Sequence, residues 1–124
     1  MARVGRKDTG AERTVRSLLH KNGFRFRLHV ADLPGKPDIV LPRYRTAVFV
    51  HGCFWHQHAE CRRAHRPTSN TEYWNKKLDR NVARDNRNLS KLREMNWKVI
   101  VVWECKLKNQ TRFAQDLIKG IRQK

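Results

Sequence analysis

Residues 51–61 concentrate side chains that bind metals and transfer protons. The segment reads His-Gly-Cys-Phe-Trp-His-Gln-His-Ala-Glu-Cys and holds two of the three cysteines of the chain. Cys53, His58 and Cys61 have the spacing C-x4-H-x2-C, and Cys105 is a possible fourth ligand. Structural zinc prefers four tetrahedral Cys or His ligands, so the sequence predicts a Cys3His zinc site. The alternative is one or two small buried cysteines beside surface histidines, the usual state of such residues in isolation.

A second group of residues could hold a cation against a phosphate. Asp38 follows Pro37 at the start of a predicted strand, and the next predicted strand ends at Val50 and His51. A carboxylate in such a position commonly holds a hard cation such as Mg2+. His51 and His56 are not needed for the zinc set, and imidazole titrates near neutral pH, so both are candidates for proton transfer. Taken alone, a Pro-Asp pair more often marks an ordinary turn.

Phe54 and Trp55 form an aromatic pair inside this polar loop, where core packing does not obviously require them. In a protein that binds a polyanion, such a pair can be a wedge that unstacks bases. The alternative is a small core that covers the metal site. The two interpretations are equally compatible with the residues.

The long helix predicted after the loop carries basic and amide side chains on the faces away from its apolar stripe. These side chains are Lys76, Lys77, Arg80, Asn81, Arg84, Arg87 and Lys91. They could follow a phosphate backbone or enter a groove, and a plain solvated face is the alternative. The charge of the whole chain favours phosphate contact.

The composition narrows the class of protein. The chain has 124 residues, with 28 Lys and Arg against 11 Asp and Glu, and a formal net charge of +17. Basic side chains that neutralise phosphates release condensed counterions, so this excess predicts a polyanion as partner. The length favours a single domain over residues 1–124. Three cysteines cannot all pair within one chain, which favours metal ligation or free thiols over disulfides.

No segment of the sequence indicates a membrane or a secretory route. The longest apolar runs, residues 47–50 and 99–103, are far shorter than the roughly 18 residues of a membrane span. The N-terminus is basic but lacks the apolar segment of a signal peptide. We therefore expect an intracellular protein without a membrane partner.

The spacing of apolar residues predicts the elements that position these side chains. Helical spacing predicts three helices, over residues 11–22, 71–95 and 113–121. Period-two alternation and short apolar runs predict four strands, over residues 24–30, 39–41, 46–50 and 97–103. The first of these strands should be half-buried, and the last should be covered on both faces. The order of elements predicts an α/β protein with a mixed sheet flanked by helices.

Several blocks along the chain match, in order, the motifs of one family. The blocks are Asp8-Thr9 with Glu12, GFRFRLH at 23–29, LPGKPD at 33–38, VFVHGCFWH at 48–56, Asn81 with Arg84-Asp85, and residues 97–105, which end in VVWEC. Together they resemble the very short patch repair (Vsr) DNA mismatch endonucleases over nearly the whole chain. HGCFWH and VVWEC are highly specific, whereas Pro-Asp is shared with many nucleases.

The resemblance implies a restriction-endonuclease-like α/β fold with a Mg2+-dependent active site. Asp38 matches the metal-binding aspartate, and Val50 lies where the metal takes a backbone carbonyl. His51 and His56 match the catalytic histidines. Glu12 matches an acidic residue of the first helix that supports the site.

The resemblance also assigns a structural zinc and a DNA wedge. The matching zinc ligands are Cys53, His58, Cys61 and Cys105. Phe54 and Trp55 match the aromatic wedge beside the mismatch, and Met1 falls where an N-terminal methionine intercalates from the other side. Val50 replaces a threonine of the best-known member, a change that a carbonyl ligand tolerates, and the arm that precedes the methionine is expected to be missing.

The function implied by the resemblance is repair of deaminated 5-methylcytosine. Such an enzyme nicks one strand of double-stranded DNA on the 5′ side of the thymine in a T:G mismatch. We expect a bacterial, cytoplasmic, nucleoid-associated monomer that contacts other repair proteins transiently. Two alternatives remain: a zinc-stabilised DNA-binding module without catalysis, and a related nuclease of the same fold with another DNA target.

Overall fold

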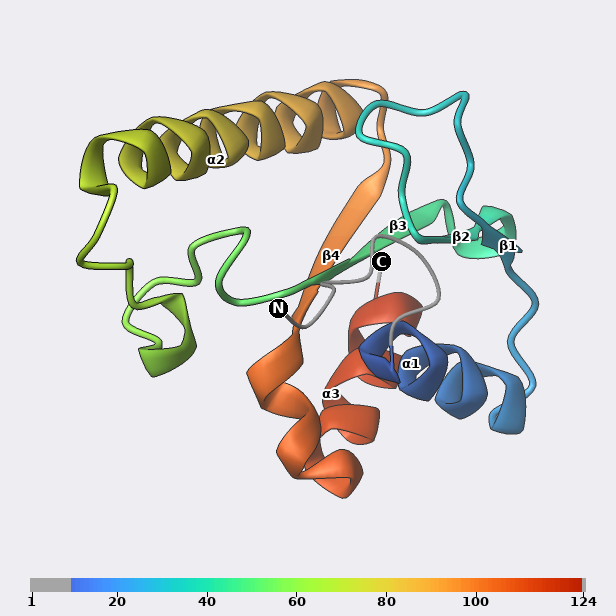
Figure 1. The fold of residues 1–124 in the computed structure, drawn as a ribbon. Helices are drawn as coiled ribbons and strands as arrows, with labels where there is room; N and C mark the ends of the chain where they lie inside the picture. Colours follow the sequence, from blue (N-terminus) through green and yellow to red (C-terminus); the bar gives the residue numbers. More distant parts are fainter. Residues whose placement is uncertain (1–9, 124) are drawn as a thin grey trace.

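A four-stranded mixed sheet lies at the centre of the described part of the chain, residues 10–123 of a computed structural model (Figure 1). Its strands, in spatial as well as chain order, are β1 (Arg27–Leu28), β2 (Ile39–Leu41), β3 (Thr46–His51) and β4 (Lys98–Trp103). The first three strands pair antiparallel, and β3 pairs with β4 in parallel. The predicted mixed sheet is confirmed.

Helices cover both faces of this sheet. Helices α1 (Gly10–Lys21) and α3 (Gln110–Arg122) lie on one face, and α2 (Thr71–Glu94) lies on the other (Figure 1). Successive side chains of a strand point to opposite faces. Val48 of β3 therefore packs in the cluster that includes α1 and α3, whereas Phe49 packs with Leu92 of α2. All three predicted helices are confirmed, and α2 is the longest.

The first predicted strand, residues 24–30, is wrong in its extent. Only Arg27–Leu28 pairs with β2, and Leu28 is 39% exposed instead of half-buried. Gly23, with φ +80°, adopts the left-handed conformation that ends α1, and Phe24 drops directly into the core. His29, with φ +48°, turns the chain out of the strand. Backbone geometry at both ends therefore overrides the alternating pattern.

The last predicted strand forms where expected, but most of its side chains are half-buried. Strand β4 pairs only with β3 among the described residues, so it is an outer strand of the sheet. Ile100 and Val102 pack toward α3, and Val99 packs toward α2. The prediction of cover on both faces is correct for these three side chains, of which Val102 is buried and Ile100 and Val99 are partly buried.

The loop between β3 and α2 is irregular, as predicted, apart from one short turn of 3-10 helix at Arg62–Ala64. Arg66 joins this loop to α2. Its guanidinium donates to Gln57 Oε1 at 2.8 Å, to Asn75 Oδ1 at 2.9 Å, and to Asp79 Oδ1 at 2.7 Å. Gln57 in turn donates to the carbonyl oxygen of Phe54 at 2.7 Å. The loop is thus fixed against the N-terminal half of α2.

Within the described residues, no helix combines the length and apolar character needed to cross a membrane.

Candidate functional site

The parallel pairing of β3 with β4 brings the cysteines together. His51 lies opposite Trp103 in the register, so Cys53 and Cys105, two residues further along each chain, leave the sheet at one edge. The Nδ1 atom of His58 lies 3.7 Å from Cys53 Sγ and 3.4 Å from Cys105 Sγ. With Cys61 included, the four ligand atoms all lie within 4.8 Å of one another.

These separations fit a tetrahedral metal site. Zinc bonds of about 2.3 Å to sulfur and about 2.0 Å to nitrogen place neighbouring donors roughly 3.5 Å apart. Burial raises the pKa of the Cys53 thiol to about 11. In the absence of a cation this thiol is therefore neutral, and binding of a metal would displace its proton. The group can hold a metal ion, and its donors are those that zinc prefers.

Trp103 covers this cluster. Its ring stacks on that of His58, with centroids 4.2 Å apart and planes 9° from parallel. The rings of Phe54 and Trp55 instead contact each other and the ring of Trp74 of α2. The ring that packs on His58 is therefore that of Trp103. This contact weakens the interpretation in which Phe54 and Trp55 cover the metal site.

Asp38 lies at the start of β2, beside the end of β3. Its Oδ2 atom accepts a hydrogen bond of 2.7 Å from the backbone N–H of Val50. In an antiparallel ladder the N–H and C=O of one residue point to the same side, so the Val50 carbonyl faces the same side as Asp38. Burial raises the pKa of Asp38 to about 6, the Val50 N–H opposes this rise, and the nearby Glu12 carboxylate adds to it.

Glu12 of α1 is brought to Asp38 by the packing of α1 on the sheet. Its side chain is only 2% exposed, and its Oε2 atom lies 3.0 Å from His29 Nε2 and 3.6 Å from Arg16 Nη1. The ligand atoms of Glu12, His29 and Asp38 all lie within 4.8 Å of one another. Glu12, which the resemblance names as a support of the site, therefore lies beside Asp38 and His29, and its role there stays a prediction.

The two predicted catalytic histidines stack on each other. The rings of His51 and His56 are 3.8 Å apart and 5° from parallel. Burial lowers the pKa of His51 to about 4, with a further decrease from His56, so His51 is neutral near pH 7. Within the described part of the chain its Nδ1 atom has no hydrogen-bond partner. His56 Nδ1 lies 2.5 Å from Asp85 Oδ2 of α2. The carboxylate can only accept, so Nδ1 of His56 donates and its Nε2 is left without a proton when the ring is neutral.

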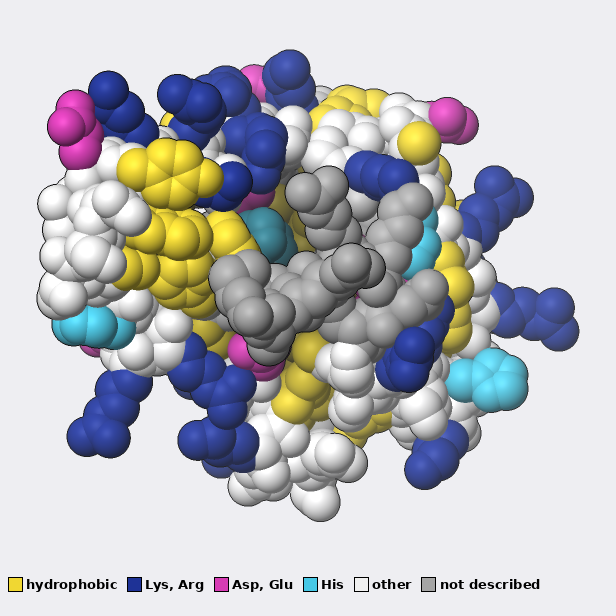
Figure 2. Space-filling model, in the orientation of Figure 1, with side chains coloured by type: hydrophobic (Ala, Val, Ile, Leu, Met, Phe, Trp, Pro, Cys, Tyr) yellow, Lys and Arg dark blue, Asp and Glu magenta, His cyan; other side chains and the backbone are white. Residues whose placement is uncertain are grey.

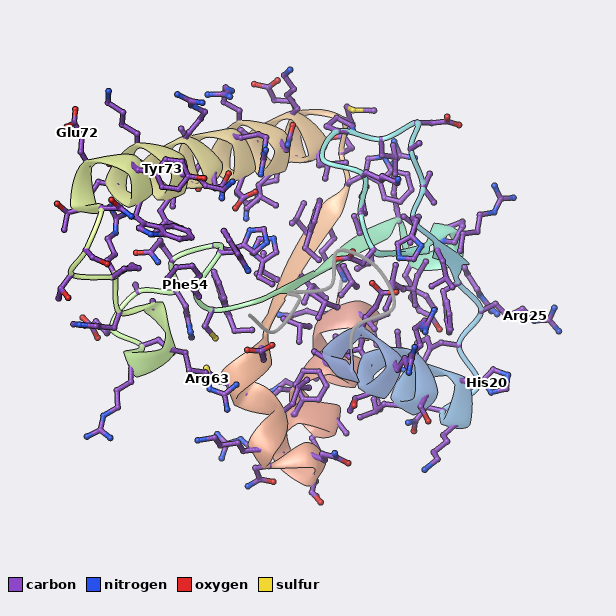
Figure 3. The ribbon with its side chains drawn as sticks, in the orientation of Figure 1. His20, Arg25, Phe54, Arg63, Glu72 and Tyr73 are labelled. Atoms are coloured by element: carbon purple, nitrogen blue, oxygen red, sulfur yellow. The ribbon has the colours of Figure 1, made fainter. Side chains whose placement is uncertain are left out.

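An aromatic group joins the loop to the start of α2. Phe54 and Trp55 contact each other and Trp74, and Trp74 contacts Tyr73, with centroid distances between 5.1 and 5.8 Å. Tyr73 is 58% exposed. Figure 3 shows Tyr73 on α2 and Phe54 on the facing loop, and Figure 2 shows hydrophobic side chains beside Lys and Arg side chains in this region. The Nζ atom of Lys77 lies 5.8 Å from the centre of the Trp55 ring.

Comparison with known proteins shows the family. Residues 1–63 match the sequence profile of the family described as DNA mismatch endonuclease Vsr. The type II nicking enzyme V.XorIIP of Xanthomonas oryzae is 52% identical over 107 residues, which are 86% of this chain and 78% of that enzyme. This chain belongs to the Vsr family. The DNA mismatch endonuclease Vsr of Escherichia coli is 41% identical over 95% of the chain and 75% of that enzyme. The type II nicking enzyme V.NmeAIP of Neisseria meningitidis is 44% identical over 99% of the chain and 87% of that enzyme.

The DNA contacts predicted for this Vsr-family chain fall into three groups. Met1 lies outside the described residues. Lys76, Lys77 and Arg80 are exposed on α2, where they can reach a phosphate backbone. Asn81 instead donates to the backbone carbonyl of Trp55 at 3.4 Å, and Arg84 donates to Asn81 Oδ1 at 3.3 Å. In this structure Asn81 therefore holds the loop as well as facing the surface.

Two side chains of the Vsr-family site had no role in the sequence prediction. Asp85 occupies a position of the apolar stripe of α2, three residues after Val82 and four before Leu89. A carboxylate inside such a stripe needs a polar partner in the protein, which is a signal that the sequence does contain. His29 lies among the polar positions of the mispredicted first strand, and the alternating pattern offers no comparable signal.

Proposed function

We propose that the chain is a Mg2+-dependent endonuclease that nicks one strand of double-stranded DNA 5′ to the thymine of a T:G mismatch. The observation that carries this proposal is that Asp38 accepts a hydrogen bond from the N–H of Val50, the residue before His51, and that His51 stacks on His56. The names of the relatives, a mismatch endonuclease and nicking enzymes, agree with it. A DNA-binding module would have no use for an oriented histidine beside a half-buried carboxylate.

The proposed chemistry is attack of water on the scissile phosphate. His56 accepts the proton of the water on Nε2, while Asp85 holds the ring through Nδ1 and stabilises the imidazolium that forms. The bond from phosphorus to the 3′ oxygen breaks, and the leaving oxygen takes a proton from solvent water, which leaves a 3′-hydroxyl and a 5′-phosphate. His51, neutral and stacked on His56, orients the phosphate, and Glu12 supports Asp38 from α1.

Asp38 and the Val50 carbonyl are the proposed ligands of Mg2+. The donor chemistry fits, because carboxylate and carbonyl oxygens are the ligands that Mg2+ prefers. When bound there, the ion would polarise the phosphate and stabilise the leaving oxygen. At the other cluster, Cys53, His58, Cys61 and Cys105 are the proposed ligands of a structural Zn2+ in a restriction-endonuclease-like fold. We propose that the enzyme acts in this form, as a monomer, in repair of bacterial DNA.

Phe54 and Trp55 are the proposed wedge at the mismatch. The stacking of Trp103 on His58, described above, supports this role because it weakens the alternative in which the pair covers the proposed zinc cluster. Exposed Tyr73 and the basic side chains of α2 flank the pair, as expected for a surface that meets stacked bases and phosphates. Unstacking a base step costs a few kcal/mol, and a mispaired step is easier to open.

We therefore expect the double variant Phe54→Ala, Trp55→Ala to lose discrimination. Its ratio of nicking rates on T:G over C:G duplexes should fall at least about tenfold, since a loss of roughly 1.4 kcal/mol at the mismatch has this effect. Zinc content and melting temperature serve as folding controls. Equal slowing on both duplexes would instead assign the pair a packing role.

The proposed function is tested by nicking of end-labelled duplexes that differ only in one base pair, T:G or C:G, in several flanking sequences. With Mg2+ the T:G duplex should be nicked at least about 100-fold faster, and without added Mg2+ neither should be nicked. Tight binding without any nick would favour the zinc-stabilised DNA-binding module. Equal nicking of both duplexes would favour a related nuclease with another target.

A further inference from the structure

His29, which has no assigned role so far, lies against both Asp38 and Glu12. Its backbone is left-handed, with φ +48°, and its N–H donates to the carbonyl oxygen of Asp38 at 3.0 Å. Six other non-glycine residues of the described chain share this backbone conformation, and His29 differs from them in its contacts with Asp38 and Glu12. The strained backbone ends β1 at the point where the imidazole of His29 meets Glu12 and Asp38.

The three side chains have the separations of donors around one cation. Nε2 of His29 lies 3.0 Å from Oε2 of Glu12, and with Asp38 the three donor atoms fall within 4.8 Å of one another. An octahedral ion with bonds of about 2.1 Å places adjacent donors roughly 3 Å apart and opposite donors roughly 4.2 Å apart. Only small side-chain shifts would therefore let all three donors reach one ion.

The charges around Glu12, His29 and Asp38 favour a contribution from a neutral donor to metal binding. Arg16 lies 3.6 Å from the same Glu12 oxygen and offsets part of the negative charge of the two carboxylates. Because of this offset, the two carboxylates attract a dication less strongly. An imidazole nitrogen would then add to the affinity for the metal ion, and it would add most for metals that bind nitrogen well. Mg2+ prefers oxygen and dehydrates reluctantly, whereas affinity for nitrogen rises along the transition metals that begin with Mn2+.

We propose that His29 is a nitrogen ligand at the Asp38 site and shifts its preference from Mg2+ toward Mn2+. This inference rests on the proposed function, because it takes Asp38 as the cation-binding carboxylate. When the ion binds, the Nε2 atom of His29 loses its proton to Nδ1 of the same ring and its lone pair turns from Glu12 to the metal. His29 thereby selects the metal without itself transferring a proton to or from DNA.

The test measures metal binding to the zinc-loaded protein without DNA. Free Mn2+ is quantified by electron paramagnetic resonance, and Mg2+ affinity is obtained by competition. In His29→Gln the amide can still donate to Glu12 but offers no imidazole nitrogen. We expect Mn2+ affinity to fall at least about tenfold and Mg2+ affinity to change less than about twofold. His20→Gln is the matched control, because His20 is exposed at the end of α1 and projects away from the sheet (Figure 3).

A spectroscopic signature separates ligation from a hydrogen bond. Electron spin-echo modulation of bound Mn2+ should show coupling to an imidazole nitrogen in the unsubstituted protein and in His20→Gln, and none in His29→Gln. Persistence of that coupling in His29→Gln, or an unchanged ratio of Mn2+ to Mg2+ affinity, would overturn the inference and leave His29 as a partner of Glu12. Binding of Mn2+ that is indifferent to Asp38→Asn would instead count against the proposed cation site and function as a whole.

Discussion

Asp38→Asn is expected to reduce nicking of a T:G duplex at least about 10³-fold while DNA affinity stays within about threefold. The substitution keeps the size of the side chain and an oxygen for the Val50 N–H, but removes the charge that holds a dication. Loss of roughly 4 kcal/mol of stabilisation in the transition state corresponds to this change in rate. Affinity is dominated by phosphate contacts of basic side chains, which the substitution leaves in place.

The measurement is a single-turnover nicking rate, with affinity from fluorescence anisotropy of a labelled duplex. Asp32→Asn is the matched control, because Asp32 is exposed on the loop that leads to Asp38 and should nick at the normal rate. A normal rate for Asp38→Asn would contradict the assignment of the active site. A parallel loss of binding and melting temperature would show that the substitution acts through the fold instead.

The second large effect is expected at the Cys53, His58, Cys61 and Cys105 cluster. Removing one ligand, as in Cys105→Ser, should lower the melting temperature by about 15 °C, since structural zinc contributes several kcal/mol to small domains and 1 kcal/mol is worth roughly 4 °C at this size. The physical reason is connectivity, because a metal held by these four residues would tie the loop after β3 to the end of β4. Without the metal, this loop, which carries His56 and the aromatic pair, would depend on weaker contacts such as those of Arg66.

Differential scanning fluorimetry and metal analysis of the purified protein check this prediction. The unsubstituted protein should contain about one zinc per chain, and Cys105→Ser much less. His65→Ala is the matched control, because His65 belongs to the same loop but is exposed and lies outside the cluster. A melting temperature that is the same with and without zinc would show that the cluster is not structural.

Local patterns account for much of what could be predicted from the sequence. The spacing of Val15 and Leu19 and the apolar stripe of α2 depend on one helix at a time, and both helices form where the spacing places them. The Cys and His cluster that could hold a metal was recognisable because three of its residues lie within nine positions. The fourth, Cys105, could be included because β4 ends just before it, although only the parallel register of β3 with β4 brings it to Cys53.

What could not be predicted depends on contacts between distant segments. His56 and Asp85 are 29 residues apart, and their contact requires the loop to fold back on α2. His29 meets Glu12 only because α1 packs under the sheet and because the strand stops early at a left-handed residue. Such a backbone reversal at a histidine opposes the alternating pattern around it, so a pattern-based prediction extends the strand through the residue that ends it.

We propose above that Asp38, His51 and His56 form a site that cuts one strand at one place. The direct measurement is the length and end chemistry of the product when each strand of a T:G duplex is labelled in turn. We expect a single nick on the 5′ side of the mispaired thymine, with a 3′-hydroxyl and a 5′-phosphate, and an intact opposite strand. Cuts in both strands, or cuts whose position ignores the mismatch, would contradict it.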